Sequence, residues 1–201
     1  DVRVEVDDAG ADGKRQQQIR HLRERVEERQ HAEHGILLVH VHGGEGRFPL
    51  AGKVADKVIV ITGGTSGIGE ATAYKMAEAG AQVVVVARDP EKAAPVMERI
   101  RKAGGDGTFI SCDLSSIEDC DKLVATVLKK FGGVDFLVNN AGRSIRRGIE
   151  SSYDRFHDFE RTMQLNYFGA LRVTMGLLPG MVEKRRGHVV NISSIGVLTN
   201  A

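Results

Sequence analysis

The stretch VIVITGGTSGIGEATAYKMAEAG, residues 58–80, joins a run of β-branched residues to an apolar-periodic helix through four glycines in seven positions. Runs of β-branched residues are typical of buried strands, and Gly80 is a suitable residue to end the helix. In parallel α/β folds, a strand-to-helix turn directs its backbone N–H groups and the positive end of the helix toward an anion. The pattern therefore predicts a phosphate-binding turn.

The glycines of this turn have separate predicted purposes. We expect Gly63 to let the chain turn as it leaves the strand, Gly67 to let the backbone approach a pyrophosphate, and Gly69 to let the helix pack on the sheet. Thr65 and Ser66 add hydroxyls that either bind phosphate or cap the helix. The spacing G-x-x-x-G-x-G differs from the common G-x-G-x-x-G fingerprint, and no Lys-Ser/Thr of a Walker loop follows. Glycine serves any tight loop, but its place between a strand and a helix favours a dinucleotide.

Strand-like and helix-like stretches alternate along the rest of the chain. The strands are apolar on both faces, which indicates a parallel sheet covered by helices on both sides. With right-handed crossovers this predicts an α/β fold, a doubly wound parallel sheet of Rossmann type. The predicted strands are residues 57–62, 82–87, 108–112, 135–140 and 188–193, and the last of the helices between them is a long one over 153–187.

Residues 1–47 differ from the dinucleotide-binding domain that we assign to residues 48–201. They are mostly polar, apart from GILLVHVH (35–42), which could form one strand, and the thin apolar stripe elsewhere is too short to stabilise a lone helix. We interpret them as a poorly packed leader or linker. The alternative is an artefactual extension or a segment read out of frame.

Composition and residue spacing argue against several classes of function. The formal net charge of +1 gives no basis for attraction to nucleic acid or a membrane surface. We find no secretory signal and no apolar run that could span a bilayer, so we expect a soluble, cytoplasmic protein. Cys112 and Cys120 are expected to be buried, reduced thiols. Neither they nor the histidine pairs of the leader have convincing metal-ligand spacing, so no metal is predicted; the pairs are His31/His34 and His40/His42.

Two later strand ends bear on which dinucleotide binds. The second strand ends at Ala87, Arg88 and Asp89, where this fold meets the adenosine ribose. Arg88 can pair with a 2′-phosphate and position 87 lacks an acid, which favours NADP over NAD. The alternative is an exposed arginine beside a helix cap, Asp89. After the third strand, Asp113 and Leu114 are expected at the adenine, with Asp113 accepting from its amino group or else capping the next helix.

Four motifs then stand in order along the chain: TGGTSGIG (62–69), NNAG (139–142), LNYFGA (165–170) and NISS (191–194). Together they resemble the short-chain dehydrogenase/reductase family over about residues 50–201. Residues 139–172 are most similar to the reductase domain of bacterial multidomain fatty acyl-CoA reductases. The resemblance implies hydride transfer between NADP(H), or NAD(H), and a carbonyl or alcohol, with a fatty aldehyde or acyl thioester as a candidate substrate.

The resemblance also implies roles for individual residues. Ser194, the second serine of NISS, would hydrogen-bond the substrate oxygen, and Asn166 would hold a water of the proton relay through its helix backbone. From the residues alone, Ser194 could equally end a strand and Asn166 interrupt a helix. The cofactor would be bound by the glycine-rich turn and the NNAG segment, through Thr62, Gly63, Ser66, Gly67, Ile68, Gly69, Asn140, Ala141 and Gly142.

The family's acid is a tyrosine followed four positions later by a lysine, and it would lie beyond Ala201. None of Tyr74, Tyr153 and Tyr167 has a lysine at that interval. We therefore expect these 201 residues alone to transfer no hydride. A noncatalytic dinucleotide-binding or assembly module is the alternative function. In either case the long helix is expected to mediate a homodimer or homotetramer.

A basic cluster follows the fourth predicted strand, near the expected entrance for substrate. It consists of Arg143, Arg146 and Arg147. These side chains could meet an acidic group such as a phosphate of coenzyme A. A solvated basic loop is the plainer interpretation.

Overall fold

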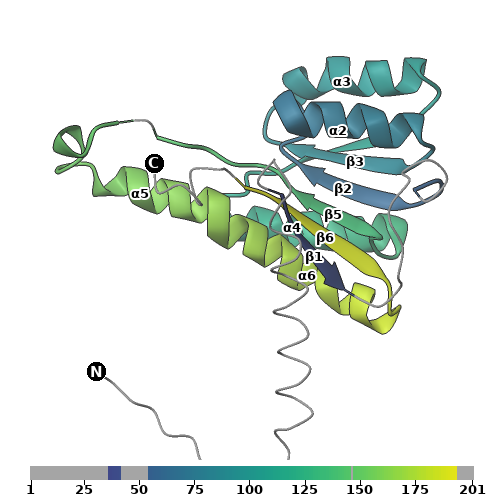
Figure 1. Ribbon diagram of the computed structural model, residues 1–201. Helices are drawn as coiled ribbons and strands as arrows, with labels where there is room; N and C mark the ends of the chain where they lie inside the picture. Colours follow the sequence, from purple (N-terminus) through teal and green to yellow (C-terminus); the bar gives the residue numbers. More distant parts are fainter. Residues whose placement is uncertain (1–35, 42–53, 146, 194–201) are drawn as a thin grey trace, which may run out of the picture. The chain divides into compact units, whose positions relative to one another are not determined.

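The computed structural model describes residues 36–41, 54–145 and 147–193, the first of these ranges through its backbone alone. Figure 1 shows a central sheet with helices on both of its sides. The strands are β1 (Ile36–Val41), β2 (Val58–Thr62), β3 (Gln82–Ala87), β4 (Asp106–Ser111), β5 (Phe136–Asn139) and β6 (Gly187–Ile192). The helices are α2 (Gly67–Glu78), α3 (Pro90–Lys102), α4 (Ile117–Phe131), the 3-10 turn η1 (Ile149–Ser151), α5 (Phe156–Met163), the π-helical η2 (Gln164–Gly169) and α6 (Ala170–Glu183).

The sheet has the strand order β1-β6-β5-β2-β3-β4, and the strands from β2 to β6 are parallel. This confirms the predicted doubly wound α/β fold, with each of the five expected strands present. The chain moves outward from β2 to β4 and then returns to the other side of β2 to begin β5. The strand order thus reverses between β2 and β5, and in such sheets ligands bind outside the carboxyl ends of the strands at this point.

Strand β1 pairs antiparallel with β6, from Ile36 opposite Ile192 to Val41 opposite Gly187. The sequence indicated a strand here but placed it within a leader over residues 1–47, so its pairing with the sheet was not anticipated. Antiparallel pairing is compatible with an otherwise parallel sheet when the added strand lies at its edge. The other residues of the expected leader, with His31, His34 and His42, lie outside the described part of the chain.

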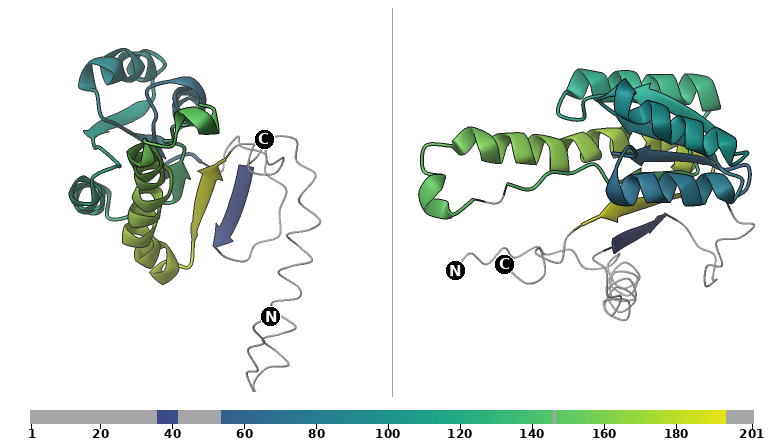
Figure 2. Two further views of the ribbon diagram at one scale, coloured as in Figure 1. Left: turned by 90° about the vertical axis from the view of Figure 1, so that its left-hand side faces the viewer. Right: turned by 90° about the horizontal axis from the view of Figure 1, so that it is seen from above.

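The two faces of the sheet are covered by different helices, α2 and α3 on one side and α4 and α6 on the other (Figure 2). The alternation along β2 shows how one strand serves both: Val58 and Val60 face the α4/α6 layer, while Ile59 and Ile61 face the α2/α3 layer. This alternation is why the strands read as continuous apolar runs. None of the described helices is both long enough and apolar enough to cross a bilayer.

The long helix predicted over residues 153–187 needs correction. Helix α5 begins at Phe156, a π-helical turn separates it from α6, and α6 ends at Glu183. The last residue of the π turn, Gly169, lies so close to the carbonyl oxygen of Leu114 that any side chain there would collide with it. After α6, Arg185 adopts a left-handed conformation (φ 50°), which ends the helix before β6. The sequence period alone does not reveal either interruption.

Candidate functional site

The carboxyl ends of β2 and β5 are joined by the side chains of Thr62 and Asn140. The buried Thr62 hydroxyl donates to the carbonyl oxygen of Val138 (3.3 Å). The Thr62 hydroxyl oxygen, in turn, accepts from the backbone N–H groups of Asn140 (3.0 Å) and Ala141 (3.1 Å). In return, the Asn140 side-chain amide donates to the carbonyl oxygens of Thr62 (3.0 Å) and Gly63 (3.1 Å). These bonds hold the glycine-rich turn against the loop after β5, where the strand order reverses.

Steric limits explain two of the glycines in the turn. Gly63 has φ +66°, and a Cβ on it would lie 2.9 Å from the Cα of Ala141. A Cβ on Gly69 would collide with the Gly63 carbonyl oxygen and the Asn140 amide. The tight turn predicted at Gly63 is found, whereas the close contacts at Gly69 are with the Gly63 carbonyl and the Asn140 amide rather than with the strands of the sheet. Gly67, in contrast, has open space where its Cβ would stand, so a ligand can approach its backbone.

Helix α2 begins at this turn with unused hydrogen-bond donors. Its N-cap residue is Ser66, whose side chain makes no capping bond, so the capping alternative for this hydroxyl is not realised. The first N–H groups of a helix have no intrahelical acceptor, and they carry the positive end of the helix dipole. Thr65 is half-buried, and Ile68 is 62% exposed beside these donors. The start of α2 is therefore chemically suited to an anion.

At the end of β3, Arg88 and Asp89 have different environments. Asp89 is the N-cap of α3, and its Oδ1 accepts from the backbone N–H of Glu91 (2.9 Å). The Arg88 carbonyl accepts from the hydroxyl of Ser111 (3.1 Å), which ties it to the neighbouring strand β4. The Arg88 side chain is exposed and makes no ion pair with any residue that the structure describes. Its guanidinium is thus available to a ligand.

At the end of β4, Asp113 does not cap the next helix. Its Oδ1 accepts from the backbone N–H of Ser115 (2.9 Å), whereas Ser116 is the N-cap of α4 and accepts from Asp119 N–H (3.1 Å). The capping alternative for Asp113 is therefore wrong, because the N-cap position of α4 lies three residues further along the chain, at Ser116. Leu114 is buried in the core, so only its backbone can face a ligand.

Asn166 is brought to the loop after β5 by the π-helical turn η2. Its Oδ1 accepts from the backbone N–H of Arg143 (2.9 Å), and its Nδ2 donates to the Arg143 carbonyl (2.7 Å). Gly142 lies beside it, since a Cβ there would stand 3.6 Å from Asn166 Oδ1. π-Helical turns occur frequently at functional sites because they break the regular backbone pattern. Ser194 lies outside the described residues, two positions after β6 ends at Ile192.

No role was predicted for Asn139, which the structure shows at the centre of a buried polar group. Its Nδ2 donates to the hydroxyl of Thr174 on α6 (3.0 Å) and to Oδ1 of Asn191 on β6 (2.9 Å). Its own Oδ1 is buried without a hydrogen-bond partner among the described residues. Asn139 and Asn191 are paired across β5 and β6. The motifs contained both asparagines, but only the strand register brings them together.

The predicted basic cluster is not free as a group. Arg147 Nη1 lies 2.7 Å from Oδ2 of Asp158, so this arginine is already neutralised by a carboxylate. Arg146 lies outside the described residues. The Arg143 side chain is exposed and forms no ion pair with a described residue. A role in binding an acidic group is thus left to Arg143 among the described members of the cluster.

The two cysteines are free, buried thiols, as predicted. Burial raises the pKa of the Cys112 thiol to about 12, and the nearby Cys120 and Asp119 act in the same direction. Burial likewise raises the pKa of Cys120. Within the described ranges, no three His, Cys, Asp or Glu side chains are grouped so as to hold a metal ion.

Comparison with known proteins links this geometry to a family. The profile of the family described as short chain dehydrogenase matches residues 57–200. The chain is 51% identical over 148 residues to a fatty acyl-CoA reductase of Acinetobacter baylyi. This match covers 74% of the chain and 50% of that reductase, so the chain spans about half the length of this relative.

Solved structures agree with the sequence comparison. A metagenomic short-chain oxidoreductase in complex with NADP has a TM-score of 0.65 and 33% identity, over 68% of this chain and 61% of that one. An NADH-dependent reductase, A1-R′, in complex with NAD has a TM-score of 0.59 and 37% identity, over 65% of this chain and 54% of that one. With its parallel sheet, its glycine-rich turn and these matches, the chain belongs to the short-chain dehydrogenase family.

Proposed function

We propose that the intact protein transfers a hydride between NADP(H) and a carbonyl or alcohol substrate. The observation that carries this proposal is the pair of hydrogen bonds that the Asn140 side-chain amide donates to the turn, one to the carbonyl oxygen of Thr62 and one to that of Gly63. These bonds fix the turn where the strand order reverses, next to the first N–H groups of α2, which have no intrahelical acceptor. Membership of the short-chain dehydrogenase family supports the same conclusion.

The cofactor contacts follow from the two hydrogen-bonded segments. We assign the pyrophosphate to the turn over residues 62–69, with the hydroxyls of Thr65 and Ser66 as additional donors. Residues 140–142 lie alongside this turn, where the Asn140 amide bonds to its carbonyl oxygens. We assign them to the ribose of the nicotinamide half. At the end of β4, Asp113 and the backbone of Leu114 are assigned to the adenine. A dinucleotide bound in this way would extend along the carboxyl ends of β5, β2, β3 and β4.

Arg88 is proposed to distinguish NADP from NAD by pairing with the 2′-phosphate. Both kinds of cofactor occur in the similar solved structures, so a direct test is needed. We expect Arg88→Ser to weaken NADPH binding by about tenfold or more and to leave NADH binding unchanged, as measured by calorimetry. The exposed Arg101 provides the control variant Arg101→Ser. Equal losses for both cofactors would argue against this role.

The proposed chemistry divides between the cofactor and this chain's own residues. When bound, the nicotinamide cofactor supplies or accepts the hydride. Ser194 is proposed to donate a hydrogen bond to the substrate oxygen and so polarise the carbonyl. The side chain of Asn166 is already occupied by Arg143, so its main chain in the π-helical turn is the part assigned to the water of a proton relay.

For the substrate we propose a fatty aldehyde or an acyl thioester, since the similar protein from Acinetobacter baylyi is named a fatty acyl-CoA reductase. Arg143 is exposed at the start of the loop after β5 and is the candidate contact for a phosphate of coenzyme A. We expect Arg143→Glu to raise KM for an acyl-CoA and to leave KM for the free aldehyde unchanged. Equal KM values of the variant and the wild type for the acyl-CoA would remove this contact.

The central experiment separates a reductase from a noncatalytic dinucleotide-binding module. Fluorescence titration of the intact protein with NADPH measures binding, and loss of NADPH absorbance with a series of aldehydes measures turnover. We expect binding and turnover in the wild type, and binding without turnover in Ser194→Ala. Binding with no turnover of any substrate in the wild type would favour the noncatalytic module, and no binding at all would reject the proposal.

Self-association is proposed for the helical face that carries exposed apolar side chains. They recur every three or four residues along α5, η2 and α6, at Phe156, Phe159, Met163, Tyr167, Leu171 and Met175. Met175 is 64% exposed although it lies in the middle of α6. We propose that a second copy covers this face in a homodimer or homotetramer. Light scattering of the wild type and of Met175→Asp tests this, since a charge there would be buried without a partner.

We also propose a cytoplasmic location. The two cysteines are free thiols, and a reducing compartment maintains cysteines in this state. Fractionation of cells that produce the intact protein would test the location directly.

A further inference from the structure

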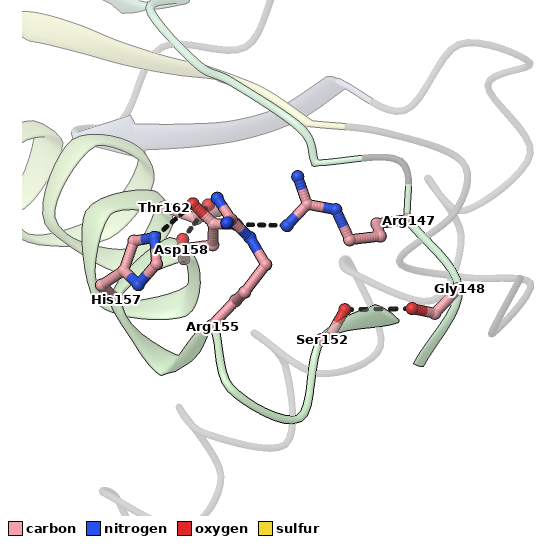
Figure 3. A network of polar contacts seen from close by, with 7 residues as sticks. All are labelled: Arg147, Gly148, Ser152, Arg155, His157, Asp158 and Thr162. Carbon is pink, nitrogen blue, oxygen red and sulfur yellow. Dashed lines mark hydrogen bonds and ion pairs between the residues drawn. The ribbon is translucent and has the colours of Figure 1, made fainter. Parts of the chain in front are cut away.

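Asp158, in the first turn of α5, is the meeting point of side chains from both ends of the loop that follows β5. Figure 3 shows Arg147 and Arg155 directed at its carboxylate. Oδ2 lies 2.7 Å from Arg147 Nη1 and 2.8 Å from Arg155 Nε. On the other oxygen, Oδ1, the distance to His157 Nε2 is 3.4 Å. The Asp158 side chain is only 13% exposed, so both guanidinium groups reach a nearly buried carboxylate.

The charges around Asp158 favour its ionised form. The hydrogen bond from Arg155 lowers the pKa of this carboxyl, and the charges of Arg155, His157 and Arg147 act in the same direction against the effect of burial. Within the described ranges, neither arginine forms an ion pair with another acid. Asp158 is therefore the group that keeps two like charges together, through bonds of the strong, charge-assisted kind.

The carboxylate is fixed by the helix rather than by the loop. Asp158 is the third residue of α5, where a negative charge interacts favourably with the helix dipole. Its carbonyl oxygen accepts from the hydroxyl of Thr162 one turn later (2.8 Å). Helix α5 thus fixes the position of the Asp158 carboxylate, and Arg147 and Arg155 bind to this fixed group.

Between the two arginines the chain forms a short exposed excursion. The turn η1 lies within it, and the hydroxyl of Ser152 donates to the carbonyl of Gly148 (3.0 Å). Ile149 and Tyr153 are 76% and 80% exposed, so the excursion has little core of its own. Upstream, the hydrogen bonds between the described residues of the loop and η2 are those of the Arg143 backbone with Asn166. Its position therefore depends on Arg147 and Arg155 at the carboxylate.

The loop begins at the edge of the sheet where the proposed reaction takes place. Asn140, its first residue, is bonded to the glycine-rich turn, and Arg143 is bonded to Asn166. Loops at the carboxyl ends of the strands line the ligand sites of α/β proteins. A displaced loop would change the space for the substrate beside the cofactor and leave the glycine-rich turn as it is.

We propose that Asp158 is a positioning residue, which holds residues 147–155 against the start of α5 through Arg147 and Arg155 and thereby fixes the loop that leads away from the reacting centre. The inference rests on the proposed function and adds to it the residue that sets the affinity for the substrate. Loss of the carboxylate leaves two guanidinium groups that repel each other, so the loop moves away from its place.

The test compares Asp158→Asn with wild type in the intact protein, with NADPH and decanal as the probes. We expect KM for decanal to rise by about tenfold, with kcat and the NADPH dissociation constant within about twofold of wild type. Asp158→Glu, which keeps the charge, should recover part of the lost affinity. Asp154→Asn is the matched control, since Asp154 is an exposed acid of the same loop and should leave KM unchanged.

Amide hydrogen exchange of residues 143–155 provides a measurement that is independent of turnover, and Arg147→Gln provides a milder second variant. Faster exchange in the loop together with a raised KM supports the proposal. Faster exchange with an unchanged KM overturns it, and so does a loss of NADPH affinity equal to the loss of decanal affinity. A wild type that binds NADPH without reducing any aldehyde would reject the proposed function, while exchange in the loop would still report on the anchor.

Discussion

The glycine-rich turn over residues 63–69 and the loop that follows β5 both begin at the carboxyl edge of the sheet but are held in different ways. The turn is bonded to buried strand ends through Thr62 and Asn140, with each bond involving a backbone group. The loop is held mainly by ion pairs of half-exposed arginines with Asp158. Ion pairs are screened by salt and buried hydrogen bonds are not. The turn is thus a fixed surface, and the loop an adjustable one beside it.

The largest expected effect comes from placing a side chain inside the fixed region. Gly69→Val would drive a side chain into the Gly63 carbonyl and the Asn140 amide. We expect a loss of about 1–3 kcal/mol in the free energy of unfolding, as for other overpacked sites. NADPH binding should fall by about a hundredfold, because the donors of the turn would move.

Urea unfolding and calorimetry measure these two effects. The control is Gly180→Ala in α6, where a Cβ meets no atom within 4 Å and a helical glycine is replaced by a better helix former. NADPH binding by Gly69→Val at wild-type strength would mean that the turn tolerates movement, and the contrast between the two regions would fail.

A smaller loss is expected when only the hydrogen bonds of the fixed region are removed. Thr62→Val keeps the shape of the side chain but leaves the N–H groups of Asn140 and Ala141 without their acceptor. Each buried donor without a partner costs about 1–3 kcal/mol, and urea unfolding measures the sum. Thr62→Ser should restore most of the stability. The exposed Thr126→Val is the control, and an equal effect of both valine variants would contradict the prediction.

The buried thiols of the core that supports the sheet sharpen the comparison through pH. The pKa of Cys112 is raised to about 12, so the neutral thiol is favoured in the folded state. Its contribution to stability is fully present below the unfolded pKa of about 8.5 and declines as the pH rises from there toward the folded value. At pH 8 a thiol reagent should therefore label neither cysteine in the native protein and both after denaturation. Rapid labelling of the native protein would show that this core opens.

The smallest effect is expected for the adjustable region, at acid pH. The pKa of Asp158 is lowered, chiefly by its hydrogen bond with Arg155, so its contribution to stability is present above the unfolded pKa of about 3.9. That contribution is lost as the pH falls through the folded value. Melting temperatures of wild type and Asp158→Asn should thus differ between pH 5 and 7. The difference should shrink below about pH 4.

The same measurement has a direct counter-outcome. A difference in melting temperature that is equal at pH 3 and pH 7 would mean that the charge of Asp158 does not contribute. Added salt should also reduce the difference at neutral pH, since the ion pairs of Arg147 and Arg155 are partly exposed.

Much of the fold was predictable because its signals are local. The apolar runs that form β2 and β3 are each visible within a few residues, and both strands are present in the structure. The glycines at 63 and 69 are likewise recognised from their immediate neighbours, and both lie in close contacts. The long helix was less predictable. The π-helical turn at 164–169 ends at Gly169, which packs closely against Leu114, a residue far away in the sequence. Pairing of β1 with β6 is a long-range contact of the same kind.

The candidate site divides along the same line. The motifs identified Asn140 and Asn166 as candidate residues. They did not predict that Asn140 binds the glycine-rich turn or that Asn166 binds the backbone of Arg143. Asn139 and Asp158 were missed, since their partners lie on other elements and no spacing rule links them. Asp113 was assigned two alternatives, and the helix start at Ser116 removes one of them.

From the sequence alone follow the doubly wound fold, the glycine-rich turn between a strand and a helix, and the family, because hydrophobic period, glycine conformation and ordered motifs are properties of neighbouring residues. Only the tertiary structure assigns the polar contacts: Thr62 to Asn140, Asn139 to Asn191, and Arg147 to Asp158. Such contacts depend on strand register and on where a helix begins. A shift of one residue in the strand register or in the helix start would move these side chains out of hydrogen-bonding range. No local sequence pattern specifies the register or the helix start to within one residue.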